Sequence, residues 1–242
     1  RVDRRQRQMC IRDRYWHNQG NALYLMTRYD EALTILNQAV EVQPDYINSW
    51  VLMSTIHRDL GNHEASLEAA ERAIAIDRSY AHAWNESGMT LEAMNRYADA
   101  IKAYDRAARY STNRTPYLYK QADVYLLQDN LVEALALLEE AIKINNRAPY
   151  LWAKHGQVLR KMSRLQEALN SYTHAVEIDD LYAWAWSGRG LTLSLLGKHD
   201  EAIDNFRRAV ELDANDVWYW YNYAEELIVQ NQFDLALEAL DE

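Results

Sequence analysis

A chain of 242 residues with 49% hydrophobic and 26% charged residues has the composition of a folded domain, which excludes a disordered or membrane-embedded protein. Only 7 Gly and 3 Pro interrupt it, so an all-α fold is expected. The formal net charge is -10, and because six Arg and two Asp stand among the first fourteen residues, the body of the chain is more acidic still. An acidic body repels phosphate backbones, so nucleic acid is not expected as a partner.

Residues 1–12 precede the regular part of the sequence and are expected to be a disordered or artefactual leader. The stretch from Gln8 to Arg14 resembles translated sequencing-adapter sequence, and the leader lacks the apolar run of a signal peptide. No run approaches the roughly 18 apolar residues of a membrane span, so no membrane insertion is expected. These absences favour a cytoplasmic location without fixing the compartment. The single cysteine, Cys10, excludes an internal disulfide framework and a cysteine-rich zinc site.

From residue 13 onward the sequence repeats with a period of 34 residues. An alanine recurs at this interval without insertion or deletion, at Ala39, Ala73, Ala107, Ala141, Ala175 and Ala209. We number the places of each repeat from residues 13, 47, 81, 115, 149, 183 and 217, which gives six complete repeats and a seventh cut short at Glu242. Each repeat is expected to form two amphipathic helices joined by a short turn. No polar capping helix follows, so the chain is expected to be a fragment.

Large and small side chains alternate in fixed columns of the repeat. The fourth place holds Trp16, Trp50, Trp84, Leu118, Trp152, Trp186 and Trp220. The eighth place holds Gly20, Ser54, Gly88, Ala122, Gly156, Gly190 and Ala224, and the twentieth holds Ala32, Ser66, Ala100, Ala134, Ala168, Ala202 and Ala236. The tryptophan column is expected to pack in the core. The two small columns are expected to face each other, as at Gly156 and Ala168, and to let the helices approach closely.

The columns carry a resemblance to a known repeat. The stretch from Trp16 to Pro44, with Trp16, Gly20, Tyr29, Ala32, Ala39 and Pro44 in order, resembles the tetratricopeptide repeat. The resemblance implies a right-handed superhelical solenoid of about seven helix-turn-helix repeats, the last one truncated, over residues 13–242. It also implies that the first helices line a concave groove that binds extended or helical peptides. The sequence departs from the family pattern at the seventh place, which is mostly polar: Gln19, Ser87, Gln121, His155 and Arg189.

Projected onto this sequence, the family's groove consists of the second, fifth, ninth and twelfth places of each repeat. The candidate peptide-binding residues are His17, Asn21, Asn48, Asn85, Tyr119, Tyr150, Arg160, Trp184, Leu191, Trp218 and Tyr221. This face is polar in the first three repeats and aromatic in the last four. Trp184 and Trp218 stand outside the tryptophan column, so a packing role is weaker for them and peptide binding is predicted. The alternative is that these rings stack on neighbouring repeats or fill space left by the polar seventh place.

No pattern of residues predicts catalysis. The seven histidines are scattered, with no His-Glu-x-x-His pair and no cysteine cluster, so neither a metal site nor a cofactor is expected. Gly188 and Gly190 form the one glycine pair that suggests a phosphate loop, but no predicted strand precedes them and Gly190 belongs to a small packing column.

The carboxylate clamp of repeats that hold heat-shock chaperone tails is also absent. It needs Lys and Asn, then Asn, then Lys and Arg on successive repeats, whereas His17 and Asn21 are followed by Leu52 and then by His82 and Glu86. A chaperone tail is therefore not an expected partner.

Three functions stay open at this point. The favoured one is a scaffold, not an enzyme, that binds a peptide segment of a partner protein in its groove. The second is the repeat arm of a larger protein whose missing C-terminal part is an enzyme, such as a transferase or kinase. The third is self-assembly through the ends of the solenoid.

Overall fold

The protein is described by a computed structural model that covers the backbone of residues 4–241 and the side chains of residues 15–241. Within residues 4–241 the chain forms fourteen helices and no strand, so the predicted all-α fold is confirmed. Of the expected leader, residues 1–3 lie outside the described residues, and α1 already begins at Arg4.

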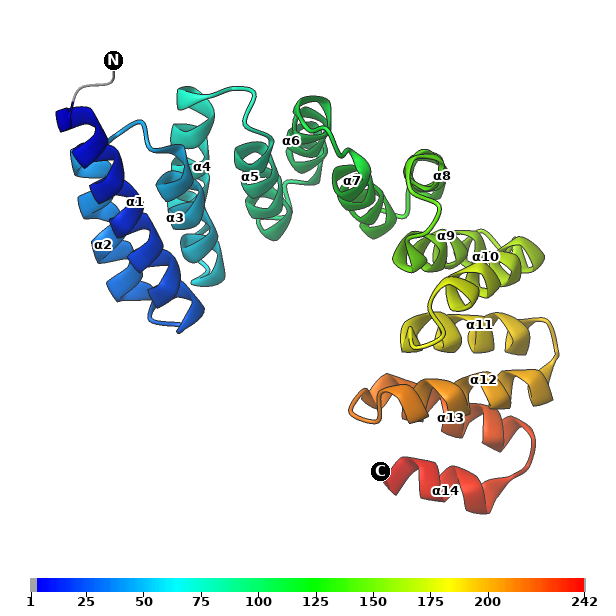
Figure 1. Cartoon of the computed structure of the whole chain (residues 1–242). Helices are drawn as coiled ribbons and strands as arrows, with labels where there is room; N and C mark the ends of the chain where they lie inside the picture. Colours follow the sequence, from blue (N-terminus) through cyan, green and yellow to red (C-terminus); the bar gives the residue numbers. More distant parts are fainter. Residues whose placement is uncertain (1–3, 242) are drawn as a thin grey trace. The chain divides into compact units, whose positions relative to one another are not determined.

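First and second helices of the repeats alternate along the chain (Figure 1). The first helices are α1 (Arg4–Leu25), α3 (Ile47–Asp59), α5 (Ala81–Ala93), α7 (Thr115–Leu127), α9 (Pro149–Lys161), α11 (Ala183–Leu195) and α13 (Val217–Val229). The second helices are α2 (Tyr29–Val42), α4 (His63–Ile76), α6 (Tyr97–Tyr110), α8 (Leu131–Ile144), α10 (Leu165–Ile178), α12 (His199–Leu212) and α14 (Phe233–Asp241). From α3 onward each first helix starts 34 residues after the previous one, so the period of the sequence is also the period of the helices.

The turn inside each repeat has one backbone conformation. The residue at the fifteenth place has a positive φ in all seven repeats: Thr27, Gly61, Asn95, Asp129, Ser163, Gly197 and Asn231. The next backbone N–H donates to the carbonyl five residues earlier, at 2.8 Å from Asn62 to His57 and 2.9 Å from Lys198 to Leu193. This bond belongs to the Schellman motif, in which a left-handed residue ends a helix and satisfies its last carbonyls.

The chain divides into two compact units, Arg1–Val124 and Tyr125–Glu242, and the boundary falls inside α7. In the first unit α1 to α6 pack in chain order, and in the second unit α8 to α14 do so. First helices also contact one another within a unit, α1 with α3, α3 with α5, α9 with α11, and α11 with α13. Each unit therefore has a face built from first helices. One continuous superhelix over residues 13–242 stays a prediction.

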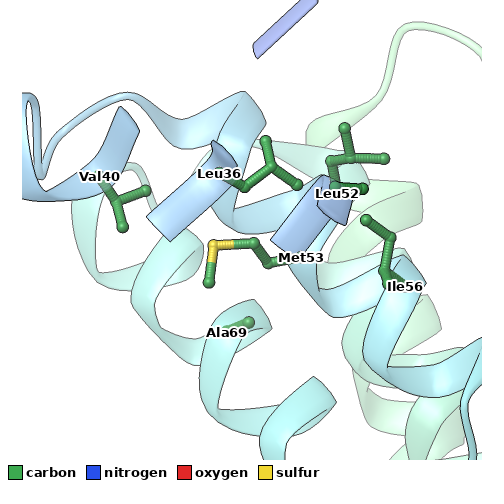
Figure 2. Close-up of a cluster of buried hydrophobic side chains, with 7 residues drawn as sticks. Leu36, Val40, Leu52, Met53, Ile56 and Ala69 are labelled. Atoms are coloured by element: carbon green, nitrogen blue, oxygen red, sulfur yellow. The ribbon is translucent and has the colours of Figure 1, made fainter. Parts of the chain in front are cut away.

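A large side chain at the twenty-fourth place fills the space above the glycines of the eighth place. Leu36 is fully buried in the cluster that Figure 2 shows, together with Met53 and Ile56. A Cβ added to Gly20 would lie 2.7 Å from Leu36 Cγ. The pairs Gly88 with Tyr104, Gly156 with Tyr172, and Gly190 with Phe206 repeat this arrangement. At these four positions the missing side chain of glycine leaves room for a leucine or an aromatic ring against the first helix.

The expected contact between the two small columns is present in the second repeat, but in the fifth repeat a different side chain lies against the glycine. In the second repeat Ser54 Oγ lies 3.1 Å from Ser66 Oγ, so the eighth and twentieth places do meet. At Gly156, however, the side-chain atoms nearest to an added Cβ belong to the ring of Tyr172 and not to Ala168. The reason is size, because an aromatic ring extends over the glycine and a methyl group does not.

The tryptophan column is half-buried, and each of its described indoles from Trp50 onward also makes a hydrogen bond. The indole N–H donates to the carbonyl six residues earlier, at 2.8 Å from Trp50 to Pro44 and from Trp84 to Arg78. Trp152, Trp186 and Trp220 make the same bond with Asn146, Asp180 and Ala214. The tryptophan column was expected to pack in the core. Its indole N–H groups also link each turn between repeats to the following first helix by a hydrogen bond. Leu118, which occupies the same column in the fourth repeat, has no indole and so cannot make this hydrogen bond. It lies in α7, the helix in which the two units divide.

Candidate peptide-binding face

The polar groove places of the first unit are linked to one another by a network across α1, α3 and α5. Arg58 forms an ion pair with Glu86, and the two side chains are only 16% and 12% exposed. Thr55 Oγ1 donates to the same Glu86 carboxylate at 3.1 Å. Arg58 also contacts Asp59, which accepts a hydrogen bond from Tyr24 at 2.9 Å. These groups therefore satisfy one another and hold the first helices together.

Two candidate residues of the first unit are also engaged inside the protein. Asn48 Oδ1 accepts a 2.6 Å hydrogen bond from the Tyr80 hydroxyl, whose pKa is raised mainly by burial. The His17 ring lies edge-on to Tyr46 with centroids 5.4 Å apart, and burial lowers the pKa of His17. At neutral pH this lowered pKa favours the uncharged imidazole.

The remaining candidates of the first unit lie on three different helices. Asn21 on α1 is exposed, while Asn85 on α5 and Tyr119 on α7 are half-buried. Asn85 Nδ2 lies 3.3 Å from Met89 Sδ, one turn further along α5. Among the candidates His17, Asn21, Asn48 and Asn85, Asn21 alone is exposed, and His82 at the second place of the third repeat is exposed as well.

The second unit exposes large apolar side chains on α13. Trp218 is 70% exposed and Tyr221 43%, and their rings meet edge to face with centroids 5.8 Å apart. The Tyr221 hydroxyl donates to Glu225, a bond that raises the pKa of Tyr221. Ile228, two turns further along the same helix, is 46% exposed. Helix α13 therefore exposes two aromatic rings that lie against each other.

A pocket of about 320 Å³ opens beside these residues, between α11, α12 and α13. Leu191 and Ser194 of α11 and Glu225 and Ile228 of α13 line it, and all four occupy predicted groove places. The other lining residues were not predicted from the sequence because they stand at other places of the repeat: Phe206, Asn222, Glu226 and Val229. Leu191 is thus the candidate residue that the structure places in a concave site.

The pocket is apolar at its base and acidic at its edge. Phe206 is 1% exposed, and Leu191 packs against the cluster that contains it. Glu226 is 4% exposed and lies 2.7 Å from His199 Nδ1, whereas Glu225 is exposed. An apolar side chain next to a cation or an N–H donor is the chemistry that fits such a site.

Two groove places on α9, the ninth and the twelfth of the fifth repeat, carry buried polar atoms. Gln157 Oε1 and Arg160 Nε are buried and have no hydrogen-bond partner within residues 15–241. Arg160 interacts with the Tyr172 hydroxyl, whose pKa burial raises. Tyr150, at the start of the same helix, is 36% exposed.

Trp184 does not behave like Trp218, although both occupy the second place of a repeat. Trp184 is half-buried against the cluster that includes Tyr172 and Val176, and the Lys154 ammonium lies 5.2 Å from its ring centroid. Ser187, at another groove place, is 4% exposed. The packing role that was expected to be weak at Trp184 is therefore present there, and Ser187 is covered by the neighbouring helices as well.

Neither a metal centre nor a membrane span is seen in the part of the chain that the structure describes. No group of three His, Cys, Asp or Glu side chains there is arranged to hold a metal ion. None of the described helices is both long enough and apolar enough to cross a membrane.

Two-helix repeats of 34 residues, packed in chain order and with a face of first helices within each compact unit, define a helical-repeat protein of the solenoid class. Family models match most of this chain in three segments: tetratricopeptide repeat models at residues 13–46 and 147–215, and the C-terminal ARM domain of tetratricopeptide repeat protein 21 at residues 31–135. The chain belongs to the tetratricopeptide repeat family, whose members act in protein–protein interaction.

The curated relatives that the chain matches are distant, and the chain spans only a small part of their length. Tetratricopeptide repeat protein 21A of Mus musculus is 26% identical over 137 residues, which is 54% of this chain and 10% of the relative. Among solved structures, PilF of Pseudomonas aeruginosa has a TM-score of 0.74 at 16% identity and covers 90% of this chain and 99% of its own. YrrB, described as a TPR protein with an unusual peptide-binding site, has a TM-score of 0.58 at 19% identity, covering 77% and 96%. Both structural likenesses show the fold.

Proposed function

We propose that the protein is a scaffold that binds a peptide segment of a partner protein on the first-helix face of its second unit, without catalysing a reaction. The pocket beside α13, together with exposed Trp218 and Tyr221, carries this proposal. A peptide would rest on the two rings and place one apolar side chain in the pocket over Leu191. Exposed aromatic rings beside a concave apolar site are the usual features of an interaction hot spot.

The contrast between the two units favours the second. In the first unit Arg58, Glu86 and Thr55 satisfy one another, so a peptide would have to break these bonds to use them. In the second unit the aromatic surface of Trp218 is open to water, and covering it is favourable at about 25 cal/mol per Å² of apolar area. Affinity should therefore reside on α11 and α13, and Asn21, Asn48 and Asn85 should contribute little.

The acidic residues of the pocket determine which charge the bound peptide should carry. Glu225 and the buried Glu226 lie in the pocket of a protein whose net charge is -10. A cationic residue beside the apolar anchor would approach these carboxylates favourably, and an acidic one would be repelled. The same reasoning disfavours a chaperone tail in the first unit, since Glu86 stands where the carboxylate clamp needs a cation and is already paired with Arg58.

The experiment compares two tryptophans that stand two residues apart on α13. Peptides are selected from a random display library on the immobilised chain, synthesised, and titrated by fluorescence polarisation. We expect Trp218→Ala to weaken binding by about 2 kcal/mol, roughly 30-fold, and to leave the melting temperature unchanged, because its ring covers no core. Asn21→Ala, an open polar side chain on α1, serves as the control and should bind normally.

Trp220→Ala supplies the opposite control. Trp220 is half-buried in the cluster of Ala224 and Leu227 and bonds to the Ala214 carbonyl, so its loss should cost up to about 3 kcal/mol of folding stability. Selected peptides that bind Trp218→Ala and wild type equally would refute the proposed site. The repeat arm of an enzyme and assembly through the solenoid ends remain alternatives that no contact within the described residues favours.

A further inference from the structure

A second and larger pocket lies in the first unit, between α5 and α6. Its volume is about 510 Å³, and its base is formed by Trp84 and Ser87 of α5 and Ala103 of α6. These α5 residues occupy the fourth and seventh places of the repeat. At 3.6 residues per turn those places point nearly opposite to the second, fifth, ninth and twelfth, so this α5–α6 pocket is separate from the first-helix face.

The α5–α6 pocket exists because two facing places of the third repeat are both small. The seventh place packs on the twenty-third place, sixteen residues later, and elsewhere one member of the pair is large. In the fifth repeat His155 Nδ1 lies 2.9 Å from Ser171 Oγ, and in the sixth Arg189 Nε donates to Asn205 at 2.6 Å. In the second repeat Met53 is buried with Ala69 in one cluster. In the third repeat Ser87 meets Ala103, and neither fills the space.

The surface above Trp84 is correspondingly open. In the sixth repeat the Arg189 guanidinium covers the equivalent Trp186 ring at 4.3 Å from its centroid. Over Trp84 the Arg106 guanidinium lies further away, at 6.0 Å from the ring centroid. The sixth repeat covers its tryptophan with its own arginine, whereas the α5–α6 pocket leaves the Trp84 ring open for an apolar group from outside to pack on.

The rim of the α5–α6 pocket is cationic, in contrast to the rest of the protein. Arg78, Lys102 and Arg106 line it together with one carboxylate, Asp99. Asp99 is paired already, since Arg96 donates to it at 2.9 Å and Lys102 at 3.2 Å, and these bonds lower the pKa of Asp99. A rim with an excess of positive charge on a chain of net charge -10 is complementary to an anionic partner.

We propose that the α5–α6 pocket binds an acidic peptide segment of a partner protein that carries one large apolar side chain. The apolar side chain lies between Trp84 and Ala103, and the flanking carboxylates face Arg78, Lys102 and Arg106. Charge complementarity at the rim selects the acidic flanks, and the apolar base selects the anchor. The site would allow the first unit to hold a ligand while the second unit binds a different one on the first-helix face.

The test uses three short fluorescein-labelled peptides and the whole chain. One peptide has a single tryptophan between glutamates, the second replaces that tryptophan with alanine, and the third replaces the glutamates with lysines. We expect the first to bind roughly tenfold or more tightly than either of the others, and its affinity to fall with added salt. Absence of binding, or equal binding of the tryptophan and alanine peptides, would overturn the proposal.

Two variants locate the site. Ser87→Met places in the third repeat the pair that Met53 and Ala69 form in the second, so it should fold, fill the pocket and weaken binding roughly tenfold or more. Arg106→Glu reverses one rim charge at the surface and should weaken binding without changing the melting temperature. Arg208→Glu makes the same change at the equivalent place of the sixth repeat and should bind like wild type.

Three further outcomes would count against the proposal. If Ser87→Met and Arg106→Glu both bound normally, the peptide would sit elsewhere. If Arg208→Glu lost as much affinity as Arg106→Glu, general charge and not the pocket would explain binding. If sedimentation showed that wild type self-associates and Ser87→Met does not, the occupant would be a second copy of this chain. The Trp218→Ala variant should bind the acidic peptide normally, so the two proposed sites fail or succeed independently.

Discussion

The fifteenth place of each repeat requires a left-handed backbone, yet only Gly61 and Gly197 provide glycine there. Thr27 adopts φ 58°, where a β-branched side chain crowds the backbone. For an ordinary residue this conformation costs about 1–2 kcal/mol, partly offset because glycine loses more entropy on folding. The sequence therefore carries avoidable strain at the first of these turns.

We expect Thr27→Gly to raise the free energy of unfolding by about 0.5–1 kcal/mol. The exposed Thr27 hydroxyl makes only a local bond with the Met26 carbonyl, so little is lost with it. Gly61→Thr is the matched reverse change and should cost about 1–2 kcal/mol, because no atom lies within 4 Å of an added Cβ and the penalty is purely conformational. Urea denaturation of both variants measures the difference. A lower stability for Thr27→Gly would mean that its side chain contributes more than the turn geometry indicates.

For the tryptophan column, the packing role of each residue could be predicted from the sequence, but its hydrogen bond could not. Recurrence at the fourth place predicted large packing groups, and Trp50 and Trp84 do pack against buried clusters. Their shared hydrogen bond could not be predicted, because its acceptor is a backbone carbonyl in the preceding turn, where the residue type varies between Pro44 and Arg78. A pattern of side chains carries no information about a backbone acceptor.

At the scale of helices, the second helix α10 shows the packing most clearly. Tyr172 is 1% exposed, and its ring lies against Gly156 of α9 and Gly188 of α11, where an added Cβ would come within 2.9 Å and 2.3 Å of it. One side chain thus joins two successive repeats. Ala168, one turn earlier on α10, is fully buried in the same crossing.

We expect Ala168→Leu to be destabilising by about 1–3 kcal/mol or more, because the added atoms must displace either Tyr172 or the α9 backbone. Gln166→Leu, an exposed position of the same helix, is the control and should stay within about 0.5 kcal/mol of wild type. Thermal unfolding followed by circular dichroism measures both. An unchanged melting temperature for Ala168→Leu would show that this crossing has free space.

Helix positions followed from the period, but the exposure of individual groove residues did not. Every first helix from α3 onward starts at the residue that the 34-residue numbering gives, since caps and turns repeat with the columns. Trp184 and Trp218 share one place, yet the first is half-buried and the second is 70% exposed. The difference lies in neighbours such as Lys154 and Tyr172, which belong to other repeats. A one-dimensional pattern places residues on a face and cannot say what covers them.

For the whole molecule, stability should be a sum over repeats and their nearest neighbours, because helices pack in chain order within each unit. Leu36 in the first unit and Phe206 in the second provide a matched pair. Both stand at the twenty-fourth place, both are almost fully buried, and each fills the space above a glycine, Gly20 and Gly190 respectively. Truncating either one removes the same kind of contact from a different unit.

We expect Leu36→Ala to cost about 2–5 kcal/mol and Phe206→Ala about 3–5 kcal/mol, each felt mainly in its own unit. Amide hydrogen exchange with mass spectrometry resolves this. Leu36→Ala should speed exchange in α2 to α4 and leave α10 to α12 protected, while Phe206→Ala should do the reverse. The physical reason is that a cavity raises the free energy only of those states in which the surrounding helices are folded. If both variants lowered protection equally along all described helices, the chain would unfold as one cooperative block, and the division at α7 would have no energetic meaning.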